Sequence, residues 1–147
     1  MVKWTRIRYL LVAWLFPGAI LVQVFLVGLS LFTTQPYWDA HIGLGHSIVL
    51  LPALQVLLAY LGKIPPPAKG LTWLSLGLTL IQTEVFAMIR TAVPTLAALH
   101  PVLALVLFAL ALIIALRART VVRAQVQMSS TSRRRSPIEE KGSLAPD

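Results

Sequence analysis

The sequence predicts an all-α membrane protein, in which four transmembrane helices form a four-helix bundle from two repeated αα-hairpins, followed by a disordered cytoplasmic tail. Of the 147 residues, 57% are hydrophobic and only 12% are charged, and the mean hydropathy is +0.79. These values lie far from those of an average soluble domain. Apolar stretches of the ~20 residues that an α-helix needs to cross a bilayer recur along the chain. The rarest residue types of the first half also recur in the second half.

The four helices are expected at about residues 9–32, 42–61, 71–90 and 98–117. The first two are free of charged residues, and the fourth carries one only at its end. The third reaches a spanning length only by including Glu84 and ending near Arg90. Residues 1–122 therefore form the predicted transmembrane domain. Residues 123–147 have a polar, Ser-rich and Arg-rich composition that cannot bury a core, and they form the predicted tail.

The positive charges predict the orientation of the bundle. Lys and Arg residues are found before the first helix, between the second and third, and after the fourth, whereas Arg90 is placed on the other side. Because cytoplasmic segments carry an excess of Lys and Arg, both termini are expected in the cytoplasm and the protein in the cell inner membrane. Topology thus accounts for the net charge of +8, and no nucleic-acid partner is expected.

An internal repeat relates the two halves of the chain. At a displacement of 59 positions the matches are Trp14 with Trp73, Gly18 with Gly77, Gln23 with Gln82 and His41 with His100. The distance from Gln to His is 18 residues in both halves. Such a repeat predicts two parallel hairpins related by a pseudo-two-fold axis along the membrane normal.

A few polar residues are predicted to lie buried within the membrane, namely Glu84, Gln23, Gln82 and Arg90. Polar groups in hydrocarbon are unfavourable and usually face the bundle interior or a cavity. Glu84 is expected to be protonated or hydrogen-bonded to a neighbouring helix, with Gln23, Gln55 or Thr83 as its partner. A proton-handling or ligand-binding role for Glu84 is the alternative.

Three histidines, His41, His46 and His100, are expected near the outer face at the starts of the second and fourth helices. The repeat pairs His41 with His100. Equal depth in the membrane instead pairs His46 with His100. His46 lies seventeen residues before Lys63 and His100 lies seventeen residues before Arg117, and these two cations are the first at the inner ends of their helices. Five residues correspond to about 140° around a helix, so His41 and His46 point to different faces. We favour His46 as the partner of His100, with His41 as the alternative.

Two histidines at equal depth on alternate helices are what axial ligation of a haem iron requires. The glycines that would leave room for the porphyrin are Gly18, Gly28, Gly43, Gly45 and Gly77. The chain has no cysteine, which excludes iron–sulfur ligation, thiol catalysis and covalent c-type haem attachment. The cofactor hypothesis is therefore haem b, with His46 and His100 as iron ligands.

The same residues carry a resemblance to known proteins. The motifs are Gln23 and Gly28 in the first helix, His41, Gly45 and His46 opening the second, Gln82 in the third, and Leu99, His100 and Pro101 opening the fourth. This pattern resembles an uncharacterised family of small bacterial four-helix membrane proteins. More remotely, it is similar to one half of haem A synthase, whose halves are four-helix bundles with histidines on helices two and four near the outer face. The resemblance covers about residues 9–117 and implies the bundle and a bis-histidine site.

The resemblance does not extend to the enzymatic chemistry of haem A synthase. In that family a Glu precedes the histidine of the second helix by three residues, and an Arg follows it. Here Ile42 follows His41, Ser47 follows His46, and Asp39 is the one acid nearby.

The sequence leaves three functions open. The first is a structural or accessory multi-pass protein of the inner membrane, in which the histidines hydrogen-bond across helices. The second is the haem-binding bundle, and the third is a small proton-handling or permeation protein that uses Glu84 and Arg90. No catalytic residue is indicated, so an enzymatic activity is not expected. The lipid bilayer is the predicted partner, and a membrane-protein partner or a second copy of the chain stays open.

Reporter fusions test the predicted topology. Fusions after Ala68 and after Arg123 are expected to report the cytoplasm, because both sites lie beside the Lys and Arg residues of the inner segments. A fusion within the outer connection, residues 33–42, is the control that should report the opposite side. A periplasmic signal at Ala68 or Arg123 would contradict the orientation.

Overall fold

The computed structural model describes the backbone of residues 2–142, and the side chains of residues 2–124 and Gln127. All regular secondary structure in this range is helical. The elements are α1 (Val2–Phe32), α2 (Trp38–Ile48), α3 (Leu50–Leu61), α4 (Pro66–Leu80), the π-helical turn η1 (Ile81–Val85), α5 (Phe86–Ile89), α6 (Pro94–Ala97) and α7 (His100–Gly142).

Four helical segments are long and apolar enough to cross a membrane, namely Val2–Phe32, Trp38–Leu61, Pro66–Ile89 and Pro94–Ala124. The prediction of an all-α chain with four helices long and apolar enough to span a membrane is thereby confirmed. The second span is interrupted at Val49 because Pro52, in the first turn of α3, has no N–H to donate to the carbonyl of Ile48. The third span contains η1, where the N–H of Phe86 donates to the carbonyl of Ile81.

The first two spans end where the sequence predicts, at Phe32 and Leu61. They begin earlier than predicted, at Val2 and Trp38. The third span begins at Pro66 and not near residue 71. Proline is tolerated in the first turn of a helix, where no intrahelical N–H bond is made, so Pro66 and Pro67 start α4 and do not form a separate connection.

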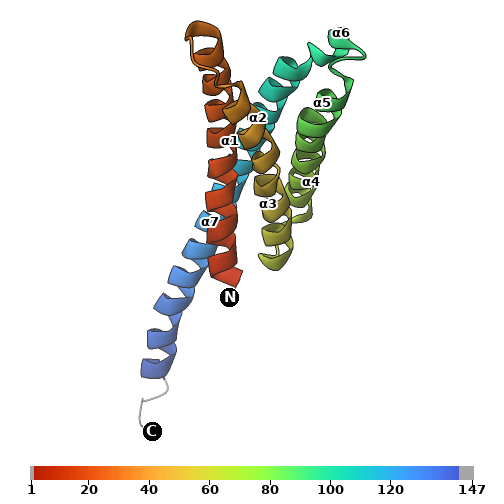
Figure 1. Cartoon of the computed structure of the whole chain (residues 1–147). Helices are drawn as coiled ribbons and strands as arrows, with labels where there is room; N and C mark the ends of the chain where they lie inside the picture. Colours follow the sequence, from red (N-terminus) through yellow and green to blue (C-terminus); the bar gives the residue numbers. More distant parts are fainter. Residues whose placement is uncertain (1, 143–147) are drawn as a thin grey trace.

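The helices form a bundle that opens toward one end (Figure 1). α1 packs against α3 and α7, and α4 packs against α3 and α7. The N-terminus and the connection between α3 and α4 lie at the end that we call the inner end. The connections at residues 33–37 and 90–99 lie at the opposite, outer end, where the α1–α2 hairpin and the α5–α6 segment diverge (Figure 1).

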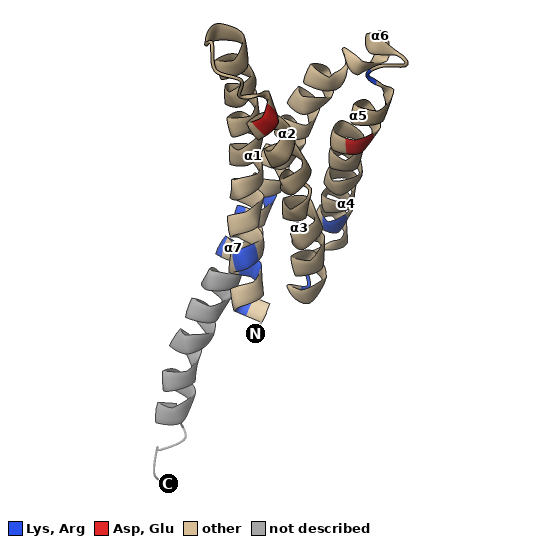
Figure 2. Cartoon of the chain, viewed as in Figure 1, with Lys and Arg blue, Asp and Glu red and all other residues tan. Residues whose placement is uncertain are grey.

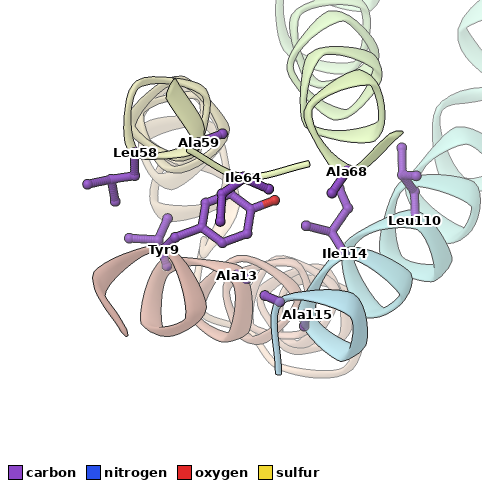
Figure 3. Packing of buried hydrophobic residues seen from close by; sticks show 11 residues of the cluster. Tyr9, Ala13, Leu58, Ala59, Ile64, Ala68, Leu110, Ile114 and Ala115 are labelled. Atoms are coloured by element: carbon purple, nitrogen blue, oxygen red, sulfur yellow. The ribbon is translucent and has the colours of Figure 1, made fainter. Parts of the chain in front are cut away.

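The hydrophobic core fills the inner part of the bundle and reaches as far as Ile20, Ile48 and Leu107. One cluster, shown in Figure 3, gathers around Tyr9, Ala59, Ile64 and Ile114, and a second gathers around Phe16. In contrast, neither residues 21–47 nor residues 83–106 contain a buried residue. The outer half is therefore held by individual polar contacts and not by a packed core.

Charged residues separate along the bundle axis, as Figure 2 shows. Lys and Arg of the described chain gather at the inner end, whereas Arg90, which caps the C-terminus of α5, lies toward the outer end. At the inner end Arg6 Nε donates to the carbonyl of Gly62 at 2.8 Å, and Arg6 Nη2 donates to the carbonyl of Lys63 at 3.3 Å. These bonds satisfy carbonyls at the end of α3. The cytoplasmic location of this end stays a prediction.

The last helix is longer than expected. α7 continues to Gly142, whereas the sequence predicts a disordered tail from residue 123. Extending an existing helix needs no new nucleation, and Arg, which occurs four times in residues 123–142, is a good helix former. Residues 143–147 of the predicted tail lie outside the described residues.

A buried hydrogen bond ties α1 to α4 and is testable by one substitution. Tyr9 Oη lies 2.9 Å from Thr72 Oγ1, and the Thr72 hydroxyl donates to the carbonyl of Ala68, so Tyr9 is the donor to Thr72. Tyr9→Phe is expected to lower the free energy of unfolding by about 1 kcal/mol, measured by reversible unfolding in mixed micelles. Tyr60→Phe is the control, because the Tyr60 hydroxyl bonds Trp73 at the exposed surface. An equal loss in both variants would contradict a specific role for the buried bond.

Candidate functional site

Six polar residues from all four spans meet in the outer half of the bundle. We call them the outer polar cluster: Gln23 on α1, His41 and His46 on α2, Gln82 and Glu84 on η1, and His100 at the start of α7. Each has a side chain or a backbone group that bonds another member of the cluster. The cluster lies where the helices diverge, so its bonds connect spans that share no apolar core at this level.

His41 is half-buried and is held in one tautomer. Its Nδ1 lies 3.2 Å from the carbonyl oxygen of Gln23, and a carbonyl oxygen can only accept. Nδ1 therefore donates, and in the neutral imidazole Nε2 then has a lone pair that can accept a hydrogen bond or bind a metal. The ring of Trp38 packs edge-on against His41, with centroids 5.8 Å apart.

His100 lies beside His41. Their ring centroids are 6.3 Å apart with an interplanar angle of 64°. The ring of Phe86 also packs against His100, with centroids 5.6 Å apart. The carbonyl of His100 accepts a hydrogen bond of 3.0 Å from Gln82 Nε2. Both Gln–His pairs that are 18 residues apart are thus hydrogen-bonded. In the first half the His side chain bonds the backbone of Gln, and in the second half the Gln side chain bonds the backbone of His.

His46 lies against Glu84. Its Nδ1 is 3.2 Å from Glu84 Oε1, and the two side chains are 53% and 52% exposed on the isolated chain. This contact joins α2 to η1, and the wide π-helical turn carries Glu84 toward it. His46 is therefore held by a carboxylate, and the ring contacts of His100 are made with His41 and Phe86.

Sequence reasoning missed the contact between His46 and Glu84. It considered Gln23, Gln55 and Thr83 as partners of Glu84, but the Thr83 hydroxyl donates to the carbonyl of Thr79. The sequence spacing does contain a signal for this contact, because His46 lies 19 residues before Pro65 and Glu84 lies 19 residues after it. In an antiparallel hairpin that turns at Pro65, the two residues reach equal depth.

The four residues predicted to be buried differ in their exposure. Gln82 is buried and Gln23 is half-buried, whereas Glu84 and Arg90 are exposed on the isolated chain. Glu84 lies within the third span and Arg90 ends α5, so the position of these two side chains within the membrane stays a prediction. The Oε1 atoms of Gln23 and Gln82 are buried and have no partner among the described residues, so this region has two hydrogen-bond acceptors that remain available.

The glycines predicted to leave room for a porphyrin differ in their surroundings. A Cβ built at Gly18, Gly28, Gly43 or Gly77 would meet no atom within 4 Å, whereas one at Gly45 would lie 3.2 Å from Gln23 Nε2. Gly45 thus allows α1 and α2 to approach closely, whereas Gly18, Gly43 and Gly77 are exposed on the surface of the isolated chain. Among the described residues no three His, Asp or Glu side chains gather to hold a metal ion, and axial ligation of haem needs only two ligands.

Substitution of Glu84 tests its contact with His46. Glu84→Gln is expected to leave assembly intact, because the amide oxygen still accepts from His46, whereas Glu84→Lys places a cation against the imidazole inside a membrane span. Yield, gel-filtration profile and thermal midpoint in detergent are the measurements. Asp39→Lys, at the first turn of α2, is the matched control and should behave as wild type. A Glu84→Lys protein as stable as Asp39→Lys would show that Glu84 faces water or lipid headgroups.

Comparison with known proteins identifies one family. Residues 23–88 match a family of unknown function, DUF6220. The matched segment runs from the middle of α1 into α5 and contains five of the six members of the outer polar cluster, all but His100. No curated protein and no solved structure gives a significant match. The chain is therefore similar to an uncharacterised family over this segment, and the match says nothing about haem A synthase.

Proposed function

We propose that this multi-pass protein lies in the cell inner membrane and holds one b-type haem near its outer face, with His41 and His100 as the axial ligands. The observation that carries the proposal is the separation of the two rings, whose centroids are 6.3 Å apart. Two imidazoles on opposite sides of one iron have centroids about 6 Å apart, because each metal–nitrogen bond is about 2 Å long. The separation of the two rings is therefore close to that expected of an axial pair.

The hydrogen bond of His41 supports its role as a ligand. Metal-bound histidines almost always donate the other ring N–H to a carbonyl or a carboxylate. The His41 Nδ1–H is directed at the carbonyl of Gln23, so Nε2 is the nitrogen left for the iron. The same bond fixes the ring orientation before any cofactor binds.

The internal repeat supports the same pair. His41 and His100 are the histidines that the displacement of 59 positions aligns, and each belongs to the hairpin whose Gln residue it bonds. The proposal therefore replaces His46, which was favoured on depth alone, with His41. A bound haem would supply one-electron redox chemistry, and the protein would position the ligands and surround the porphyrin with apolar side chains.

The contact between His46 and Glu84 favours a second candidate function, the binding and release of a proton. An imidazole and a carboxylate lie 3.2 Å apart here within membrane spans. Both groups can carry a proton, and ionisable residues in such positions mark proton pathways in membrane proteins. This pair is not needed for haem ligation, so the two functions are separable by substitution.

The spectrum of the purified protein tests the haem proposal. Protein from haem-replete cells is expected to show a Soret band, and reduction should sharpen the low-spin α and β bands. His100→Ala and His41→Ala should each abolish the low-spin spectrum because each removes one axial ligand. His46→Ala is the matched control on the same helix and should keep it.

Other outcomes would change the ligand assignment or reject the proposal. Loss of the low-spin spectrum in His46→Ala but not in His41→Ala would replace His41 with His46 as the ligand. Colourless protein, or a spectrum indifferent to His100→Ala, would reject the haem proposal. The outer polar cluster would then be a set of hydrogen bonds that joins the spans of a structural or accessory protein.

A further inference from the structure

The face of the third span that points into the bundle is polar at successive turns. Its buried residues are Thr72, Ser75 and Thr79 on α4, followed by Gln82 on η1. The opposite side of the same span carries exposed apolar residues such as Trp73 and Leu74. On α3, Gln55 is completely buried. A polar row thus runs along the inside of a bundle that is apolar outside.

Most hydroxyl groups of this row are hydrogen-bonded within the protein. The Thr72 hydroxyl donates to the carbonyl of Ala68 at 2.9 Å, and the Thr79 hydroxyl donates to the carbonyl of Ser75 at 2.7 Å. In contrast, Gln55 Nε2, Gln55 Oε1 and Ser75 Oγ are buried without a partner among the described residues. Groups of this kind are strongly unfavourable in a dry apolar interior.

Gln55 and Ser75 lie on neighbouring helices at equal depth. Gln55 lies ten residues before Pro65 and Ser75 lies ten residues after it, which is the relation by which His46 and Glu84 meet in the same hairpin. α3 packs against α4, and both side chains are completely buried. The two residues therefore share one layer of the bundle interior.

The layer is closed from the inner end of the bundle. Figure 3 shows Tyr9, Ile64 and Ile114 packed together between the helices there, and all three are almost fully buried. A ligand in this layer would therefore be enclosed by protein. Gln55 and Ser75 supply both donors and acceptors and no charge, which suits water and not a bare cation.

We propose that Gln55 and Ser75 bind internal water that bridges α3 and α4 in the middle of the bundle. Buried water molecules make about three hydrogen bonds to groups that otherwise have no partner, and the two side chains present three such atoms. The water completes a polar row from Tyr9 to Gln82, whose Nε2 donates to the carbonyl of His100. The inner half of the bundle and the outer polar cluster are thereby connected by hydrogen-bonding groups, whether or not haem binds.

Water-edited solid-state NMR of the full-length isotope-labelled protein in lipid bilayers tests the proposal. Magnetisation from water protons should build up at the Gln55 side-chain amide and at Ser75 Cβ. The dry references are Ala59 and Ala115, which are equally buried and apolar. Transfer to Gln55 and Ser75 no faster than to these alanines would overturn the proposal.

Two substitutions distinguish bound water from general wetting of the bundle. Ser75→Ala removes one water ligand and is expected to reduce the transfer to the Gln55 amide by about twofold or more. Thr79→Val is the matched control, because it is equally buried on the same face and its hydroxyl is already bonded to a carbonyl. Equal transfer in both variants would reject a shared water.

A reciprocal variant keeps the test decisive if Ser75→Ala does not fold. Gln55→Leu should abolish the transfer to Ser75 Cβ, because it removes two of the three atoms that hold the water. Unchanged transfer to Ser75 would show that the hydroxyl is hydrated without Gln55, and the bridge between α3 and α4 would be rejected.

Discussion

The structure depends on one constraint, which is that polar groups inside a bilayer must find partners within the protein. The helices satisfy their own backbone groups, and the polar side chains are left to bond across spans. In the outer half these bonds run from α1 to α2, from α2 to η1 and from η1 to α7. In the inner half they run from α1 to α4. The positions of these few groups therefore decide how the four spans are arranged.

The two halves of the bundle meet this constraint differently. The inner half has an apolar core and connections that are tied by Arg6, so its polar groups are enclosed. The outer half has no buried residue in 21–47 or in 83–106, and its histidines remain reachable. A rigid inner half that supports an open outer half is a suitable scaffold for a site, since ligand side chains are precise only when the elements that carry them are held in place.

Much of the fold could be predicted from the sequence, because hydropathy and charge act locally. The four spans, and the ends of the first two at Phe32 and Leu61, follow from the length of the apolar runs. The site was harder, since two patterns competed for the histidines. Depth ranked His46 first, but the π-helical turn, which no sequence pattern indicated, carries Glu84 to His46. The contact of His41 with His100 then agrees with the repeat.

The sequence by itself determined the class of protein, the number of spans and the residue types that occupy the membrane, because these depend on the free energy of transfer of each segment into lipid. Only the tertiary structure decided which polar groups meet. A contact such as that between His46 and Glu84 depends on the rotation of two helices about their axes and on a single wide turn, and both are set by packing against other spans. Residue spacing records the depth of a side chain in the membrane, but it does not record which neighbour the side chain faces.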